Sequence, residues 1–266
     1  KAIGNLFQAI PQADMCLRFV GGCVRDAIIG QPITDIDFAT SLKPEEILKH
    51  LENAGIQAIP TGLSHGTVTA VIDKHPFEIT TLRHDVETDG RHATVAFTDQ
   101  WQEDAKRRDF TFNALYMDRQ GQVEDYFSGL EDLHGGHVRF IGNPHDRIRE
   151  DYLRILRFFR FYSRYGRLEP DAQTLQALKE EGPGLQKISR ERITKEILIL
   201  LSLPEPLKAL KYLDHAKLSP FCFGVHIDLV AFETFLSFEK SFKLDPHPIA
   251  RLAALTKRNR DKAGKF

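Results

Sequence analysis

The chain is poor in the residues on which several protein classes depend. Its 266 residues include three cysteines, two methionines and one tryptophan. Cys16, Cys23 and Cys222 are odd in number and form no CxxC pair. This argues against a disulfide framework or a zinc knuckle and is typical of a reducing compartment. No apolar run approaches the roughly 18 residues of a membrane span, so we predict no membrane partner.

A strong excess of one charge and a secretory signal are also missing. The net charge is −1, which gives no global indication of nucleic-acid binding. The first residues show no basic segment followed by an apolar one, so the sequence contains no recognisable secretory signal. Together with the reduced cysteines, this predicts a cytoplasmic location. Because the sequence does not begin with Met, a removed leader stays compatible with that prediction.

Charge is more informative locally. Residues 139–167 contain eight arginines against three acidic residues, and residues 251–266 contain six basic residues against one aspartate. Basic clusters of this kind are able to bind phosphates. The alternatives, a solvated helix face for the first and a frayed tail for the second, stay open.

The first half of the chain mixes strand and helix signals. Residues 41–55 predict a helix with Ser41 as N-cap, and two β-branched runs, residues 66–73 and 75–83, predict a strand pair. The polar residues 84–97 show little periodicity and predict a flexible loop. Residues 106–118 are interpreted as helical.

After about residue 138 the sequence is almost wholly helical. The predicted helices cover residues 150–166, 171–181, 189–202 and 206–216. We therefore expect an α+β fold. Its parts are a head with a small mixed β-sheet and flanking helices (1–138), an all-α neck (139–200) and the start of a helical body (201–266).

Two aspartates stand two residues apart in the segment DID. Side chains at i and i+2 of a strand project from one face, so Asp35 and Asp37 form a carboxylate pair, with Ile36 and Phe38 on the other side. Such a pair is unfavourable without a cation, and its hard oxygen donors suit Mg²⁺. A surface strand end is the alternative.

Two further features strengthen the metal hypothesis. Gly21 and Gly22 precede a short helix, where backbone N–H groups can approach a phosphate, and Arg25 follows one turn later. Glu78 lies in a predicted strand between two apolar residues. If that strand neighbours Asp37, three carboxylates converge and can hold two metal ions. An exposed acid on an amphipathic strand is the alternative for Glu78.

Five segments in this order resemble one family. They are GGCVRDAIIG with DID, FEITTLRHDVETDGRHA, RRDFTFNA, REDYLRILRFFRF and SRERITKE. They are similar to motifs of the class II tRNA nucleotidyltransferases (CCA-adding enzymes) and bacterial poly(A) polymerases, within the DNA polymerase β-type nucleotidyltransferase superfamily. The resemblance covers residues 18–196, about two-thirds of the chain. The DxD pair alone is a weak signal, whereas the ordered set is strong.

The resemblance implies roles for residues of the head. Catalysis is assigned to Asp35, Asp37 and Glu78, with Mg²⁺ bound by the two aspartates. The residues implied to bind the nucleotide are Gly21, Gly22, Arg25, Arg108, Asp109 and Asn113. Capping and i,i+4 polar support are equally good readings of Asp109 and Asn113.

The segment REDYLR is implied to recognise the base. Asp151 and Arg154, taken as three apart on one helix, present an acceptor and a fork of donors that match the amine and ring nitrogen of cytosine or adenine. Uracil and guanine place a carbonyl where the amine is required. Arg157 and Arg160 match family positions near the nucleotide. An ordinary surface ion pair is the alternative for Asp151 and Arg154.

The resulting expectation is an enzyme that adds CCA to the 3′ end of tRNA from CTP and ATP with Mg²⁺, releasing pyrophosphate. Residues 66–83 and 84–97 look like the CCA-adding type. Poly(A) polymerase and CC-adding or A-adding enzymes stay open, as, more remotely, does a non-catalytic RNA-binding module. Family members usually continue beyond the equivalent of residue 266, so we expect RNA affinity to be incomplete. The oligomeric state is not predicted.

Overall fold

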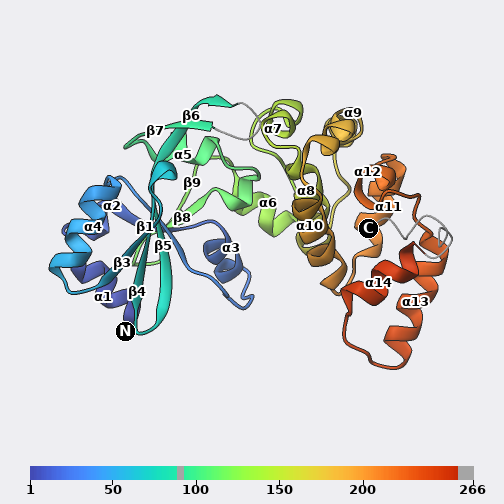
Figure 1. Cartoon of the computed structure of the whole chain (residues 1–266), viewed down its shortest axis with the longest axis horizontal. Coiled ribbons are helices and arrows are strands. Elements are labelled where there is room, and N and C mark those ends of the chain that lie inside the picture. Colours follow the sequence, from blue (N-terminus) through green and yellow to red (C-terminus); the bar gives the residue numbers. More distant parts are fainter. Residues whose placement is uncertain (89–92, 257–266) are drawn as a thin grey trace. The chain divides into compact units, whose positions relative to one another are not determined.

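The computed structural model describes residues 1–88 and 93–256. The chain divides into two compact units, Lys1–His134 and Gly135–Phe266. The units contain a mixed sheet and a set of helices respectively (Figure 1), which confirms the α+β expectation. The proposed three-part division at residues 138 and 200 stays a prediction. Within the described residues, no helix combines the length and the apolar character needed to cross a membrane.

The described part of the first unit contains a seven-stranded sheet with the order β3-β4-β5-β2-β1-β8-β9. Its strands are β1 (Leu17–Val20), β2 (Asp37–Thr40), β3 (Gln57–Gly62), β4 (Thr67–Ile72), β5 (His75–Thr81), β8 (Leu115–Met117) and β9 (Val123–Asp125). The strands β2 and β5 run parallel, and the other neighbours run antiparallel. The predicted strand pair over residues 66–83 is therefore confirmed as β4 and β5.

Helices cover both faces of this sheet. They are α1 (Ala2–Ala9), α2 (Ala13–Cys16), α3 (Gly22–Ile28), α4 (Pro44–Asn53), α5 (Trp101–Lys106) and α6 (Gly129–Gly135), with 3₁₀ turns η1 (Leu63–His65) and η2 (Thr111–Asn113). Figure 1 shows α1, α2 and α4 on one side and α3 on the other. Phe7, Ile47, Phe38 and Ile79 are buried together in the core on the α1–α4 side.

Three expectations for the first unit were wrong. The segment 84–97 is a two-stranded hairpin in its described part, β6 (Arg83–Thr88) paired with β7 (Ala93–Phe97), while residues 89–92 lie outside the description. The segment 106–118 leaves the helical state after Lys106, because Leu115–Met117 pairs with β1 and β9. The helix α4 is capped at Lys43, whose backbone N–H donates to the Glu46 carboxylate at 2.8 Å, and not at Ser41.

The described part of the second unit is helical. Its elements are α7 (Pro144–Glu150), α8 (Leu153–Tyr165), α9 (Ala172–Glu181), η3 (Gly182–Lys187), α10 (Arg190–Ser202), α11 (Leu207–His215), α12 (Ser219–Phe223), α13 (Leu229–Ser241) and α14 (Pro248–Leu255). The predicted helices 171–181, 189–202 and 206–216 are confirmed. The predicted helix 150–166 is split, because α7 ends at Glu150 and α8 begins at Leu153.

A buried ion pair joins three elements of this unit. Arg251 of α14 is 3% exposed and donates to Glu239 of α13 at 2.7 Å. Its guanidinium also donates to the carbonyl oxygens of Leu201 and Leu203, at 2.8 and 2.6 Å. The guanidinium thus satisfies carbonyls at the C-terminal end of α10 that have no partner within the helix. Of the basic cluster 251–266, only residues 251–256 are described.

Gly129 allows α6 to pack directly on the η2 backbone. A Cβ at this position would lie 2.3 Å from the carbonyl oxygen of Thr111. Because that oxygen belongs to the backbone, α6 and η2 must separate to admit a side chain at position 129. The adjacent bond from Thr111 Oγ1 to Asp132, 2.6 Å long and buried, depends on the same close approach.

We therefore expect Gly129→Ala to lower the free energy of unfolding by about 1–3 kcal/mol, the usual cost of forcing atoms into a packed site. Gly4→Ala is the matched control, because a Cβ at Gly4 meets nothing within 4 Å and alanine is the better helix former. Thermal unfolding of both variants measures the difference. Equal midpoints for the two would contradict the close-packing explanation.

Candidate active site

Two carboxylates lie side by side on adjacent parallel strands. Asp37 begins β2, and its register partner across the sheet is Glu78 of β5. Their neighbours Phe38 and Ile79 are fully buried in the core. Because successive side chains alternate between the faces of a sheet, Asp37 and Glu78 both project from the opposite face. The sequence predicts that Glu78 converges with the aspartates if its strand neighbours that of Asp37. The pairing of β2 with β5 meets this condition.

Asp35 stands outside the strand. The strand begins at Asp37, so the expectation that both aspartates belong to one strand was wrong. Asp35 is exposed, and its carboxylate accepts a hydrogen bond from Thr34 Oγ1 at 3.2 Å. Its charge still reaches Asp37 and raises the pKa of that carboxyl. The three acids are thus electrostatically coupled, although they do not share one regular element.

The glycine turn lies next to this group. Gly21 has φ +73°, a conformation that residues with a side chain rarely adopt. A Cβ on Gly21 would lie 3.4 Å from Arg108 Nη1 and 3.6 Å from the carbonyl oxygen of Asn113. Glycine is therefore favoured by the backbone conformation, and the two distances show that Arg108 and Asn113 lie in contact range of the turn. Gly22 is the first residue of α3.

Three residues predicted to bind the nucleotide form one buried network. Arg25 donates to both carboxylate oxygens of Asp26, at 2.9 and 3.1 Å, and to Asn113 Oδ1 at 2.5 Å. Asn113 Nδ2 in turn donates to Asp109 Oδ1 at 2.9 Å. The network joins α3 to the RRDFTFNA segment beside the glycine turn. The i,i+4 support foreseen for Asp109 and Asn113 is present, and their role toward the nucleotide stays a prediction.

Asp151 and Arg154 of the second unit are not paired along one helix. Asp151 precedes α8, and its Oδ1 accepts the backbone N–H of Leu153, the first residue of that helix, at 3.1 Å. The prediction that both residues stand on the helix was therefore wrong. Asp151 Oδ2 accepts from Arg192 at 3.0 Å. Arg154 Nη1 donates to Glu150 at 2.6 Å and to the carbonyl oxygen of Arg147 at 2.8 Å.

Arg157 and Arg160 contact aromatic and acidic side chains. Their guanidinium carbons lie 5.2 and 4.2 Å from the centre of the Phe161 ring. Arg160 also donates to Glu196 of α10 at 2.7 Å. Arg160 therefore links α8 to α10, in addition to any role toward a nucleotide. Sequence reasoning missed Arg192, although the quoted segment SRERITKE contains it.

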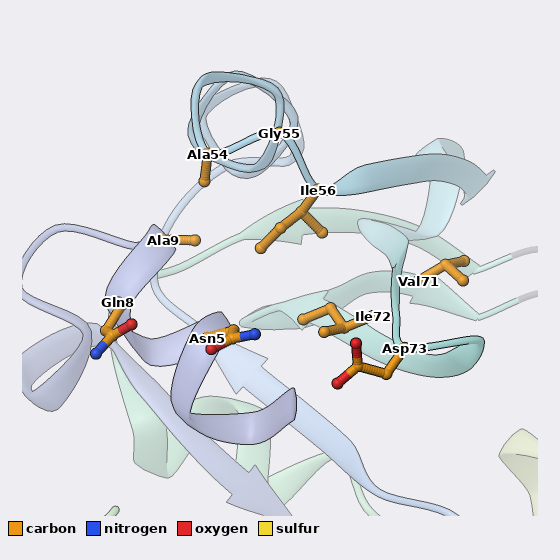
Figure 2. Close-up of a pocket in the computed structure, with 9 residues that line it drawn as sticks. All are labelled: Asn5, Gln8, Ala9, Ala54, Gly55, Ile56, Val71, Ile72 and Asp73. Atoms are coloured by element: carbon orange, nitrogen blue, oxygen red, sulfur yellow. The ribbon is translucent and has the colours of Figure 1, made fainter. Parts of the chain in front are cut away.

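A pocket of about 450 Å³ lies elsewhere in the first unit, between α1, the end of α4 and the β4–β5 hairpin (Figure 2). Its lining residues are Asn5, Gln8, Ala9, Ala54, Gly55, Ile56, Val71, Ile72 and Asp73. None of the predicted site residues belongs to this lining. The pocket is therefore separate from the carboxylates of Asp35, Asp37 and Glu78.

Comparison with known proteins finds the family that the sequence motifs resemble. Residues 17–139 match the family described as poly A polymerase head domain, and residues 167–224 match the probable RNA and SrmB-binding site of polymerase A. The solved structure of Bacillus stearothermophilus CCA-adding enzyme in complex with CTP is similar, with a TM-score of 0.73 and 31% identity over 97% of this chain and 68% of that chain. The chain belongs to the class II tRNA nucleotidyltransferase and poly(A) polymerase family.

Curated relatives of the family are more similar in sequence but longer. The chain is 42% identical to the mitochondrial CCA tRNA nucleotidyltransferase 1 of Danio rerio over 92% of this chain, and 40% identical to the CCA-adding enzyme of Bacillus cereus (strain Q1) over 82%. It spans only 57% and 54% of those two proteins. Since one relative is described as mitochondrial, the cytoplasmic location stays a prediction.

Nucleotidyltransferases of this family generally use a divalent metal ion, and the donors of this site fit one. Burial raises the pKa of Asp37, and the charges of Glu78 and Asp35 raise it further, while Arg108 opposes them. A cation bound to these oxygens would relieve that repulsion. Across residues 1–88 and 93–256, no three His, Cys, Asp or Glu side chains already stand in a metal-holding arrangement.

We expect Glu78→Gln to stabilise the metal-free protein at neutral pH, because like charges directly opposite on neighbouring strands cost about 0.2–1 kcal/mol. Adding Mg²⁺ should raise the melting temperature of the wild type more than that of Glu78→Gln, since the variant has lost one carboxylate. Glu52→Gln, at an exposed position on α4, should respond to Mg²⁺ as the wild type does. A melting temperature of metal-free Glu78→Gln below the wild-type value would contradict the repulsion.

Proposed function

We propose that this chain is the catalytic part of a template-independent nucleotidyltransferase that adds CCA to the 3′ end of tRNA from CTP and ATP, releasing pyrophosphate. The observation that carries the proposal is the registered pair of Asp37 and Glu78 beside the Gly21 turn and Arg108. Acidic oxygens next to a glycine turn and a guanidinium suit a triphosphate with its cation. The names of the curated relatives support the same activity.

The residues divide the work by charge. Asp35 and Asp37 would hold Mg²⁺, which supplies charge neutralisation to the triphosphate and activates the attacking hydroxyl when bound. Glu78 adds a third carboxylate to that group. Arg108, beside the turn of Gly21 and Gly22, would donate to phosphate oxygens. As in other phosphoryl transfers, positioning and electrostatic stabilisation account for most of the catalysis.

Base selection is a separate part of the proposal and rests on the second unit alone. A carboxylate accepts from the exocyclic amine of cytosine or adenine, and a guanidinium donates to the ring nitrogen beside it. Asp151 and Arg154 supply these two groups. Their present contacts with Arg192 and Glu150 leave them half-buried. Selecting a base would require both groups to reach it alongside these contacts or in place of them.

Poly(A) synthesis is the second candidate, because the family model that matches residues 17–139 is described as a poly A polymerase head domain. CC-adding and A-adding enzymes differ from the main proposal only in where addition stops. The hairpin β6–β7, whose sequence looks like the CCA-adding type, favours the complete CCA reaction.

The products distinguish these activities. On a tRNA lacking its terminal nucleotides, with CTP, ATP and Mg²⁺, we expect a defined addition of three nucleotides. Separation of labelled RNA at single-nucleotide resolution measures it. A long ladder with ATP alone on an unstructured oligonucleotide would instead identify a poly(A) polymerase. Extension that stops after two cytidines, or that requires a primer already ending in CC, would identify a CC-adding or an A-adding enzyme.

The carboxylates make a second prediction. Asp35→Ala should lower nucleotide incorporation on the order of a thousandfold or more, since metal-ion charge stabilisation is worth several kcal/mol. RNA affinity, measured by fluorescence anisotropy, should stay near the wild-type value. Asp14→Ala, at an exposed position of α2, should retain full incorporation. Unchanged turnover in Asp35→Ala would remove this residue from the proposed catalytic group.

A further inference from the structure

A buried acid outside the predicted site contacts one of the predicted site residues. Asp104 of α5 is 1% exposed. Its Oδ2 accepts from Arg108 Nη2 at 3.1 Å and from the Tyr116 hydroxyl at 2.7 Å. Its Oδ1 accepts from Arg107 Nε at 2.9 Å and from the backbone N–H of Arg83 at 3.3 Å. Both oxygens of the Asp104 carboxylate are thus engaged by donors.

Tyr116 of β8 holds the same guanidinium from a second direction. The residue is fully buried. Its hydroxyl oxygen accepts from Arg108 Nε at 3.2 Å while donating to Asp104, and its ring centre lies 5.3 Å from Arg108 Cζ. The ring of Trp101 packs edge-on against Tyr116 at 5.4 Å, which restricts the movement of Tyr116.

The contacts fix which part of Arg108 approaches the glycine turn. Nε and Nη2 donate to Tyr116 and Asp104, and Nη1 is the atom that a Cβ on Gly21 would meet. The positive charge of Arg108 also acts on Asp37, whose pKa it lowers against the effect of the other carboxylates. Arg108 is therefore held with one end of its guanidinium beside the turn and close to the carboxylates.

We propose that Asp104 and Tyr116 are positioning residues that orient Arg108 toward the phosphates of the incoming nucleotide. The inference rests on the proposed function. A long arginine side chain loses rotamer entropy when it is ordered. Ordering it within the fold, before the nucleotide arrives, removes that cost from binding.

The protonation states suit this role. The charges of Arg108 and Arg107 hold the pKa of Asp104 at about 2 despite its burial, so the carboxylate stays ionised at neutral pH. Burial raises the pKa of Tyr116, which keeps its hydroxyl a donor to Asp104. The same carboxylate accepts from Arg83, the first residue of β6, so the base of the β6–β7 hairpin and Arg108 share one anchor.

Tyr116→Phe is the decisive variant, because it removes one hydroxyl and keeps the buried ring. We expect the KM for CTP and for ATP to rise roughly three- to tenfold, the loss typical of one hydrogen bond. The KM for tRNA and kcat should change by less than about twofold if Arg108 acts on nucleotide binding. Tyr126→Phe is the matched control, since its hydroxyl donates to Glu124 at 2.7 Å beside the same cluster.

A double-mutant cycle separates positioning from general packing. In an Arg108→Ala background, Tyr116→Phe should raise the nucleotide KM no further, because the residue it orients is gone. Additive effects of the two substitutions on the nucleotide KM would overturn the inference, and so would an unchanged nucleotide KM in Tyr116→Phe alone. Nucleotide incorporation by the wild type would still support the proposed function in either case. If the wild type incorporates no nucleotide, the same cycle measured on CTP binding by calorimetry decides the inference. Absence of CTP binding by the wild type would overturn both.

Discussion

Asp37 and Glu78 face each other across two parallel strands, and the repulsion between their carboxylates is the constraint on which the candidate site depends. Phe38 and Ile79, the next residue of each strand, are buried in the core and so fix the face on which the acids stand. Hydrophobic packing on one side of the sheet thereby maintains an unfavourable charge arrangement on the other. Such an arrangement is expected at a site whose ligand carries the opposite charge.

Arginines differ in how much of their charge is available to a ligand. The eight arginines of residues 139–167 suggested a phosphate-binding surface. In the folded unit, Arg160 is paired with Glu196, and Arg147 and Arg154 both contact Glu150. The pairs made by Arg160 and Arg154 join helices to one another, and the pair made by Arg147 lies within α7. The charge of the sequence segment therefore exceeds what it offers to nucleic acid.

The sequence predicted elements whose pattern is local. The strands β4 and β5 and the helices α9, α10 and α11 follow from β-branched runs, end signals and apolar periodicity. Residues 84–97 were misread although their strands pair with each other, because their polar sequence shows little alternation. Residues 106–118 were misread because the strand Leu115–Met117 is set by pairing with a distant segment, and pairing overrides weak local preference. Leu115–Met117 pairs with Leu17–Val20, for example, a partner almost a hundred residues away that no local window contains.

The same distinction applies to the candidate site. Asp35, Asp37, Glu78 and the glycine turn were predictable because spacing and residue type are visible in the sequence. Asp104 carried the weak signal of an acid four residues before Arg108, but its second donor, Tyr116, comes from another strand. Arg192 reaches Asp151 across 41 residues. Contacts of this kind depend on the fold and are not visible in any motif.

The buried pair of Arg251 and Glu239 has a consequence for the dynamics of the second unit. One guanidinium is bonded to α13 and to the last carbonyls of α10, while its own backbone belongs to α14. Local unfolding of any of these segments leaves a charge or a carbonyl without its partner in a dry environment. The three segments should therefore open and close as one foldon, with similar amide hydrogen-exchange protection along their lengths.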